Sequence, residues 1–286
     1  MANRVRKAVF PVAGLGTRLL PATKTMPKEM LTIVDRPLIQ YAVDEARDAG
    51  IEEMIFVTGR GKSTLIDYFD ESFELEATMR DRGKSLDALE PSRARFGEIV
   101  AVRQQQPLGL GHAVWCARDI VGDEPFAVLL PDDLMHGAPG ALRQMVEAWE
   151  KVGGNLIATE EVAADRTNAY GIITPGETRG ELTEVRGLVE KPDPKDAPSR
   201  LGVIGRYILQ PELMRVLDNK ERGAGGEIQL TDAMAKLIGK QPFHALKVDA
   251  VRYDCGDRTG FVIANLAVGL DREDVGPKLR EYLKGV

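Results

Sequence analysis

Residues 8–31, AVFPVAGLGTRLLPATKTMPKEML, decide the fold of this chain. The apolar run from Ala8 to Val12 predicts a strand, and the glycine loop GLGTR of residues 14–18 follows it directly. Glycines at the end of a strand leave backbone N–H groups free to approach phosphate oxygens. Arg18 and Lys28 add positive charge within the same segment. The stretch therefore predicts an α/β protein with a polyphosphate site at the end of its first strand.

Two common phosphate-binding motifs do not fit the sequence. The dinucleotide fingerprint needs a third glycine after Gly14 and Gly16, and Leu19 stands at that position. The P-loop motif needs a glycine five residues before Gly61, and that position is Phe56. These departures argue against NAD binding and Walker-type ATP hydrolysis. Taken alone, the glycine loop is equally compatible with a structural turn after a strand.

Several segments in a fixed order carry a family resemblance. In chain order they are GLGTRLLP (residues 14–21), PKEML (27–31), Arg103-Gln104, GLGHA (109–113), LPDD (130–133), AYG (169–171) and VEKP (189–192). This order resembles the sugar-1-phosphate nucleotidyltransferases. Within that family the likeness is greatest to the bacterial enzymes that transfer a uridylyl group from UTP to glucose 1-phosphate. The match spans nearly the whole chain, which makes it more specific than any single motif.

Composition limits the possible partners. The chain has 286 residues, a net charge of −6, two cysteines and three histidines. An acidic chain argues against a nucleic-acid or anionic-membrane partner, which needs a basic surface. Two cysteines without a C-x-x-C pair argue against a disulfide framework or a zinc site. We expect a cytoplasmic protein, because neither a signal peptide nor a membrane span is apparent.

Apolar runs alternate with helical patterns along the first half of the chain. This alternation predicts a doubly wound, mostly parallel central sheet of Rossmann-like nucleotidyltransferase type, followed by a strand-rich sugar-binding insertion. We expect one domain over residues 1–286, with a nucleotide-binding half (1–135) and a sugar-phosphate-binding half with C-terminal helices (136–286). Helical patterns cover residues 38–49, 111–117, 140–152, 228–238 and 277–283. Residues 73–97 predict a helix and an exposed connection.

The resemblance implies a Mg²⁺-dependent nucleotidyl transfer. It assigns Arg18 and Lys28 to the triphosphate and Asp132 to the metal, with Asp254 as a second acidic ligand. Carboxylate oxygens are the ligands that Mg²⁺ prefers. Aspartates after strands are also common as turn or cap residues. For Asp254 a turn role and a metal-ligand role have equal weight. Asp133 should face away from the metal, because neighbours on an extended chain point to opposite sides.

The remaining assignments concern the sugar and the base. Lys191 resembles the family's lysine that holds the sugar phosphate, and Glu190 resembles the carboxylate that binds glucose hydroxyls. Gly171 has no side chain and can let the hexose approach the backbone. Gln104 can offer a donor and an acceptor to uracil from one amide. The nucleotide-binding set is completed by Ala13, Gly14, Gly16, Thr17, Glu29 and Gly109. His112 has no assigned catalytic role, because its place at a helix start favours packing or capping.

Alternatives remain open from the sequence alone. The run Gln104-Gln105-Gln106 offers three amides, which leaves uracil and thymine both possible, and a thymidylyl-transferring relative shares the chemistry. A non-catalytic sugar-nucleotide-sensing subunit should have lost Arg18, Lys28, Asp132 or Lys191, and all four are present. The expected partners are UTP, glucose 1-phosphate and further copies of the chain, as a dimer or tetramer.

Overall fold

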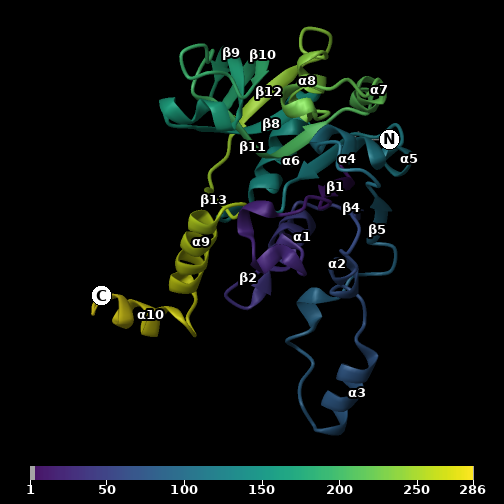
Figure 1. The fold of residues 1–286 in the computed structure, drawn as a ribbon, viewed down its shortest axis with the longest axis vertical. Helices are drawn as coiled ribbons and strands as arrows, with labels where there is room; N and C mark the ends of the chain where they lie inside the picture. The colour runs from purple at the N-terminus through teal and green to yellow at the C-terminus, as the bar shows by residue number, and fades with distance from the viewer. Residues whose placement is uncertain (1–3, 286) are drawn as a thin grey trace.

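A computed structural model describes residues 4–285 and is built on one nine-stranded sheet (Figure 1). The strand order is β5-β4-β1-β6-β11-β8-β12-β10-β9. In chain order these strands are β1 (Lys7–Pro11), β4 (Glu53–Thr58), β5 (Ile99–Arg103), β6 (Phe126–Leu129), β8 (Asn155–Glu161), β9 (Gly171–Arg179), β10 (Leu182–Glu190), β11 (Leu201–Leu209) and β12 (Phe243–Lys247).

Helices cover both faces of this sheet. On β1, Ala8 and Phe10 pack toward α1 (Leu38–Asp48) and α6 (Ala141–Val152). Val9, between them, packs on the other face. That face is covered by α4 (Leu110–Cys116), α7 (Glu212–Asp218) and α8 (Leu230–Ala235), while α5 (Arg118–Val121) follows α4. The doubly wound α/β class is confirmed, because successive apolar side chains of one strand need cover on both sides. The helix predicted over residues 228–238 is shorter in the structure, where α8 covers only Leu230–Ala235.

The direction of the strands differs between the two halves of the sheet. Strands β5, β4, β1 and β6 are parallel neighbours, as predicted. Beyond β6 only β8 and β12 pair in parallel, and the other pairs are antiparallel. The hairpin β9–β10 turns at Gly180, whose φ of 63° suits glycine, and such tight turns join antiparallel strands. The sheet as a whole is therefore mixed, with most of its parallel pairs among the strands up to β6.

Smaller elements lie outside the main sheet. A ribbon of β7 (Asp133–His136) and β13 (Val251–Asp254) pairs Asp133 with Asp254. It leads into α9 (Arg258–Asp271) and α10 (Gly276–Leu283), which lie beside the α/β body in Figure 1. Strands β2 (Thr32–Ile33) and β3 (Arg36–Pro37) form a second short pair. No helix between residues 4 and 285 is long and apolar enough to cross a membrane.

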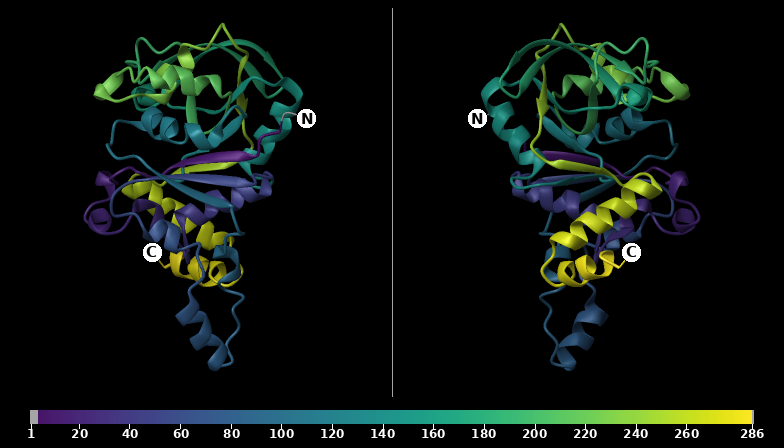
Figure 2. Two further views of the ribbon diagram at one scale, coloured as in Figure 1. Left: turned by 90° about the vertical axis from the view of Figure 1, so that its right-hand side faces the viewer. Right: turned by 90° about the vertical axis from the view of Figure 1, so that its left-hand side faces the viewer.

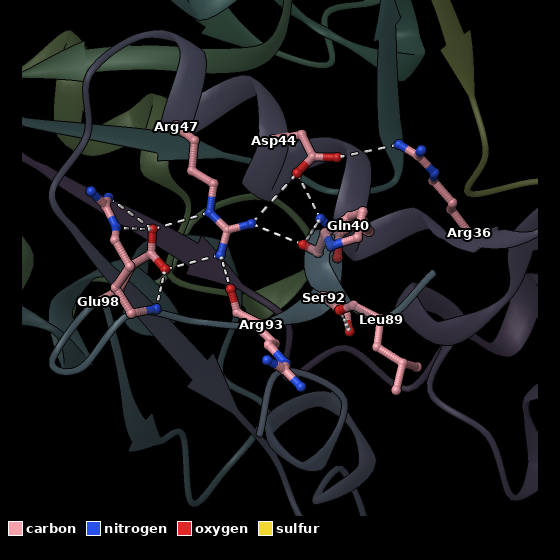
Figure 3. A network of polar contacts seen from close by, with 10 residues as sticks. Arg36, Gln40, Asp44, Arg47, Leu89, Ser92, Arg93 and Glu98 are labelled. Atoms are coloured by element: carbon pink, nitrogen blue, oxygen red, sulfur yellow. Dashed lines mark hydrogen bonds and ion pairs between the residues drawn. The ribbon is translucent and has the colours of Figure 1, made fainter. Parts of the chain in front are cut away.

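The segment after β4 extends away from the body. It contains α2 (Thr64–Asp67) and α3 (Phe73–Asp81), and Figure 2 shows the α3 region as a projection. Its returning chain is tied to α1 by Arg47, which donates to the carbonyls of Pro91 and Arg93 and to the Glu98 carboxylate (Figure 3). Burial disfavours the Glu98 carboxylate, yet the hydrogen bonds from Arg47 and Arg95 lower its pKa to about 2. This network anchors the base of the projection to the core.

Candidate active site

Two adjoining cavities open at the ends of the central strands. The first, of about 390 Å³, follows β1 and contains the glycine loop; we call it the glycine-loop cavity. The second, of about 360 Å³, is the Lys191 cavity. Both are lined by Leu110, Leu130, Asp132 and Glu227, so they meet at a common wall. The loop after β1 and the acidic pair after β6 therefore lie at the same edge of the sheet, where α/β proteins bind ligands.

Most of the predicted nucleotide-binding residues line the glycine-loop cavity. They are Ala13, Gly14, Gly16, Thr17, Lys28, Gln104 and Gly109. Gly16 has a φ of 65° and begins a short 3-10 helix, Thr17–Leu19. A Cβ on Gly16 would lie 3.2 Å from the Cβ of Lys28, so a glycine is needed where the loop packs on the lysine segment. The loop and Lys28 thus form one unit.

Lys28 and Asp132 form a close ion pair in the wall between the cavities. The Lys28 Nζ lies 2.5 Å from the Asp132 Oδ2, and the pair joins residues 104 positions apart. Burial disfavours both charges, but each charge stabilises the other. The pKa of Lys28 is raised and that of Asp132 is lowered, and Arg18 contributes to the second shift. Both groups are therefore charged at neutral pH, as the binding of phosphate and a cation requires.

Asp254 faces the same small volume as Asp132. A Cβ on Gly256 would lie 3.0 Å from the Asp132 Oδ2, 3.0 Å from the Asp254 Oδ1 and 2.6 Å from Arg18 Nη2. The Asp132 Oδ2 and the Asp254 Oδ1 are therefore at most twice 3.0 Å apart. Arg18 lines the Lys191 cavity beside them, and not the glycine-loop cavity. The pairing of β7 with β13 produces this arrangement, because it sets Asp254 opposite Asp133.

The two carboxylates fit a magnesium ion. Mg²⁺ is typically held by one or two protein carboxylates together with substrate phosphates and water. Within residues 4–285 no group of three or more His, Cys, Asp and Glu side chains forms a complete metal cage. Two carboxylates beside the glycine loop match the magnesium pattern and not a preformed structural metal site.

Asp133 has different partners from Asp132. Its Oδ1 accepts hydrogen bonds from Arg252 at 2.7 and 2.9 Å, and its Oδ2 accepts from the backbone N–H of Gly205 at 2.9 Å. Burial raises the pKa of Asp133, against the opposing effect of Arg252. Asp133 therefore holds the sheet and the β7–β13 ribbon together, while Asp132 faces Lys28.

Glu190 and Lys191 both line the Lys191 cavity despite being neighbours at the end of β10. Lys191 has a φ of 47°, and this left-handed conformation turns the chain so that both side chains reach one side. Lys191 Nζ lies 3.0 Å from Glu190 Oε1, and Thr231 Oγ1 donates to Glu190 Oε2 at 2.7 Å. Gly171 lines the same cavity, and a Cβ there would lie 2.8 Å from Thr231 Cγ2. The backbone distortion before Pro192 is thus a left-handed residue, Lys191.

Glu29 occupies a different position from the one predicted. It is buried and lines neither cavity, and its Oε2 accepts a hydrogen bond from Lys62 Nζ at 2.8 Å. Burial raises the pKa of Glu29, while Lys62 and Lys28 oppose this shift. The prediction of a direct uridine contact by Glu29 is not supported, because its carboxylate faces Lys62 inside the protein.

Four residues that shape the site are not among those predicted from the sequence. Thr231 positions Glu190, Arg252 holds Asp133, Gly256 makes room for Arg18 and the carboxylates, and Lys62 pairs with Glu29. The Tyr253-Asp254-Cys255-Gly256 turn carried a signal for Gly256, since an aspartate precedes a glycine there. The others carry no local pattern, because each acts through a partner far away in the chain.

Known proteins resemble this chain over nearly its whole length. A model of the nucleotidyl transferase family matches residues 7–269. A UTP–glucose-1-phosphate uridylyltransferase of Komagataeibacter xylinus is 55% identical over 260 residues, which cover 90% of this chain and 92% of that protein. A UTP-bound UGPase from Acinetobacter baumannii has a similar structure, with a TM-score of 0.90, 42% identity and 98% coverage of each chain. A UDP-glucose pyrophosphorylase in complex with UDP-glucose has a TM-score of 0.85 and 42% identity, covering 94% of this chain and all of that one.

Proposed function

The chain belongs to the nucleotidyl transferase family, and on that premise we propose that it transfers a uridylyl group from UTP to glucose 1-phosphate. The products are UDP-glucose and pyrophosphate. The observation that carries this function is the pair of cavities that share Asp132, one with the glycine loop and Gln104, the other with Glu190 and Lys191. Two anionic substrates bound in adjoining cavities are held in line for reaction, which lowers the entropic part of the barrier.

The reaction needs charge neutralisation more than proton transfer. The attacking phosphate of glucose 1-phosphate is already an anion at neutral pH, so no general base is required. Its oxygen forms a bond to the α-phosphorus of UTP, and the bond to the pyrophosphate oxygen breaks. We expect Lys28, in the glycine-loop cavity, and Arg18, beside Asp132 at the common wall, to neutralise the phosphates of UTP, and Lys191 to orient the attacking phosphate.

Asp132 and Asp254 are the residues that would hold Mg²⁺. The bound ion would supply positive charge to the phosphate oxygens of the transition state. Asp132 also keeps the Lys28 ammonium charged and fixed before substrate arrives. A larger residue at position 256 would have to displace the Arg18 guanidinium and would press on both carboxylates.

The experiment that tests the function is a substrate matrix. Pyrophosphate release is measured for UTP, dTTP, CTP and ATP against glucose 1-phosphate and other hexose 1-phosphates, with and without Mg²⁺. We expect the highest rate with UTP, glucose 1-phosphate and Mg²⁺ together. Comparable pyrophosphate release from UTP alone would indicate a hydrolase, and a preference for dTTP would favour the thymidylyl alternative.

Replacement of Lys191 by alanine is expected to impair glucose 1-phosphate use and not UTP affinity. Loss of one charge-assisted contact to a phosphate should cost roughly 2–3 kcal/mol, or about two orders of magnitude in kcat/KM. Because this phosphate is also the nucleophile, kcat should fall as KM rises. Steady-state kinetics with each substrate varied, and calorimetry of UTP binding, measure this split.

Two variants complete that experiment. Lys195→Ala removes a positive charge from the exposed loop after Lys191 and should leave both constants unchanged. Arg18→Ala should show the complementary defect, on the UTP side. A Lys191→Ala enzyme that lost UTP binding but kept its glucose 1-phosphate constants would reverse the assignment of the two segments.

We also propose that the chain forms a homo-oligomer, a dimer or a tetramer. Apolar side chains are exposed on α9, where Val262 is 64% and Ile263 is 49% accessible, and on the projection, where Phe73 is 77% accessible. Val262 and Ile263 adjoin each other on α9, and adjoining exposed apolar side chains on a soluble protein typically mark an interaction site. Light scattering should give a multiple of the chain mass of 31.3 kDa, and a strictly monomeric mass at micromolar concentration would refute the proposal.

We further propose that the protein is located in the cytoplasm. Cys116 and Cys255 are both free thiols, and burial raises the pKa of Cys255 to about 12. Free cysteines are typical of a reducing compartment. Cell fractionation should recover the protein with soluble cytoplasmic markers, and recovery outside the cytoplasm would contradict this location.

A further inference from the structure

The side-chain amide of Gln104 is held in one orientation by two acceptors. Its Nε2 lies 3.0 Å from the carbonyl oxygen of Gly109 and 3.0 Å from Nδ1 of His112. A carbonyl oxygen only accepts hydrogen bonds, so the Gln104 atom that faces Gly109 must be the NH₂ group. Its second hydrogen then points to Nδ1 of His112, which must accept. The contacts therefore require a neutral His112 with its proton on Nε2.

The surroundings of His112 hold both acceptors in place. Gly109 has a φ of 111° and a Cβ there would lie 2.8 Å from the Ile228 carbonyl oxygen, while the N–H of Ile228 donates to Leu108 at 2.7 Å. The His112 ring stacks on Trp115 with an interplanar angle of 24°, and Arg118 and Lys220 lie 3.9 and 4.3 Å from the centre of the indole. Neighbouring backbone and a cation-flanked aromatic ring thus fix the two groups that Gln104 contacts.

The charges around His112 favour its neutral form. Burial, together with the positive charge of Lys220, lowers the pKa of His112. Arg103, from β5, and Arg118, from α5, line a cavity of about 280 Å³ that His112 also lines. At neutral pH the ring therefore keeps Nδ1 free to accept the hydrogen bond from Gln104.

We propose that His112 and the Gly109 carbonyl lock the Gln104 amide with Oε1 toward the nucleobase, so that His112 is a positioning residue that determines base specificity. The inference rests on the proposed function, which sets the base beside Gln104. Within residues 4–285 both hydrogens of Nε2 are used and Oε1 forms no hydrogen bond. Oε1 is thus the group that Gln104 can offer to a ligand.

A locked acceptor discriminates between pyrimidines. Uracil and thymine carry an N3–H that donates to Oε1, whereas N3 of cytosine is an acceptor and would face another acceptor. A site whose polar group is left unpaired by the wrong ligand rejects that ligand strongly. If the amide were free to rotate by 180°, its NH₂ could donate to cytosine instead. The lock therefore favours UTP and dTTP over CTP, and it does not separate UTP from dTTP.

The test compares His112→Leu with His112→Asn. Leucine removes the hydrogen-bond acceptor for Gln104. Asparagine restores one at nearly the same place, because its Oδ1 is bonded to Cγ, as Nδ1 of histidine is. We measure kcat/KM for UTP, dTTP and CTP with saturating glucose 1-phosphate. His112→Leu should lower the UTP-to-CTP ratio by roughly tenfold or more, and His112→Asn should recover most of it. The UTP-to-dTTP ratio should not change in either variant.

The outcomes separate the inference from the function on which it rests. A wild-type enzyme that does not use UTP fails the proposed function. A wild-type enzyme that prefers UTP over CTP, with the preference unchanged in His112→Leu or not recovered in His112→Asn, overturns the lock. If His112→Leu does not fold, ¹⁵N NMR of the wild-type imidazoles decides. With three histidines in the chain, the His112 signals can be assigned, and protonation at Nδ1 at neutral pH would overturn the inference.

Discussion

Replacement of Asp132 by asparagine is expected to lower kcat by roughly a thousandfold while leaving the fold intact. Asparagine keeps the size of the side chain and removes the charge that faces Lys28 at 2.5 Å and shares a small volume with Asp254. Loss of this charge removes one of two carboxylates for Mg²⁺ and frees Lys28 from its partner. Steady-state rates over a range of Mg²⁺ concentrations measure the effect.

UTP binding distinguishes loss of the metal ligand from general damage. Without Mg²⁺, Asp132→Asn should bind UTP at least as tightly as the wild type, because a negative charge beside the phosphates has gone. The increase in UTP affinity on adding Mg²⁺ should be lost. Asp123→Asn, at an exposed position, is the matched control and should behave as the wild type. A folded Asp132→Asn variant with near-normal rates at limiting Mg²⁺ would remove Asp132 from the site.

Replacement of Arg206 by methionine is expected to lower the free energy of unfolding by about 3–5 kcal/mol. Arg206 is 1% exposed and contacts Glu45 through Nε and Nη2, the closest distance being 2.7 Å. The same guanidinium donates to the carbonyls of Leu130, Gly205 and Asp133. Methionine would leave the Glu45 carboxylate buried without its countercharge and would free three carbonyls inside the protein.

Urea unfolding and thermal melts measure this loss, which corresponds to a fall in Tm of roughly 10 °C. Arg215→Met, on the exposed side of α7, is the control and should change stability by less than about 0.5 kcal/mol. Adding Glu45→Met to Arg206→Met should recover part of the loss, because no unpaired charge remains. A loss below about 1 kcal/mol in Arg206→Met alone would show that the pair does not hold this region together.

Arg206 also connects stability to the site. The carbonyls of Leu130 and Asp133 flank Asp132 on either side, and Arg206 fixes both. Glu45 in turn accepts from the N–H of Leu142 at 2.9 Å, which ties the start of α6 to the same cluster. We therefore infer that this buried ion pair holds the backbone on which Asp132 is mounted.

The features that the sequence determined by itself are local. The apolar run before the glycine loop and the helices at 38–48 and 141–152 agree with the structure. Each depends on residues close together in the chain, where hydrophobic periodicity and the conformational preferences of glycine and proline decide the backbone. The ordered motifs also sufficed to predict the family.

Tertiary structure alone decided which distant residues meet. Strand register in the β7–β13 ribbon brings Asp254 beside Asp132, and packing in the interior pairs Glu29 with Lys62 and Arg206 with Glu45. Packing of whole elements also sets the antiparallel half of the sheet. It likewise brings His112, on α4, into contact with Gln104, after β5. No local pattern specifies such pairs, because register and burial are set by the combined packing of many side chains across the sheet.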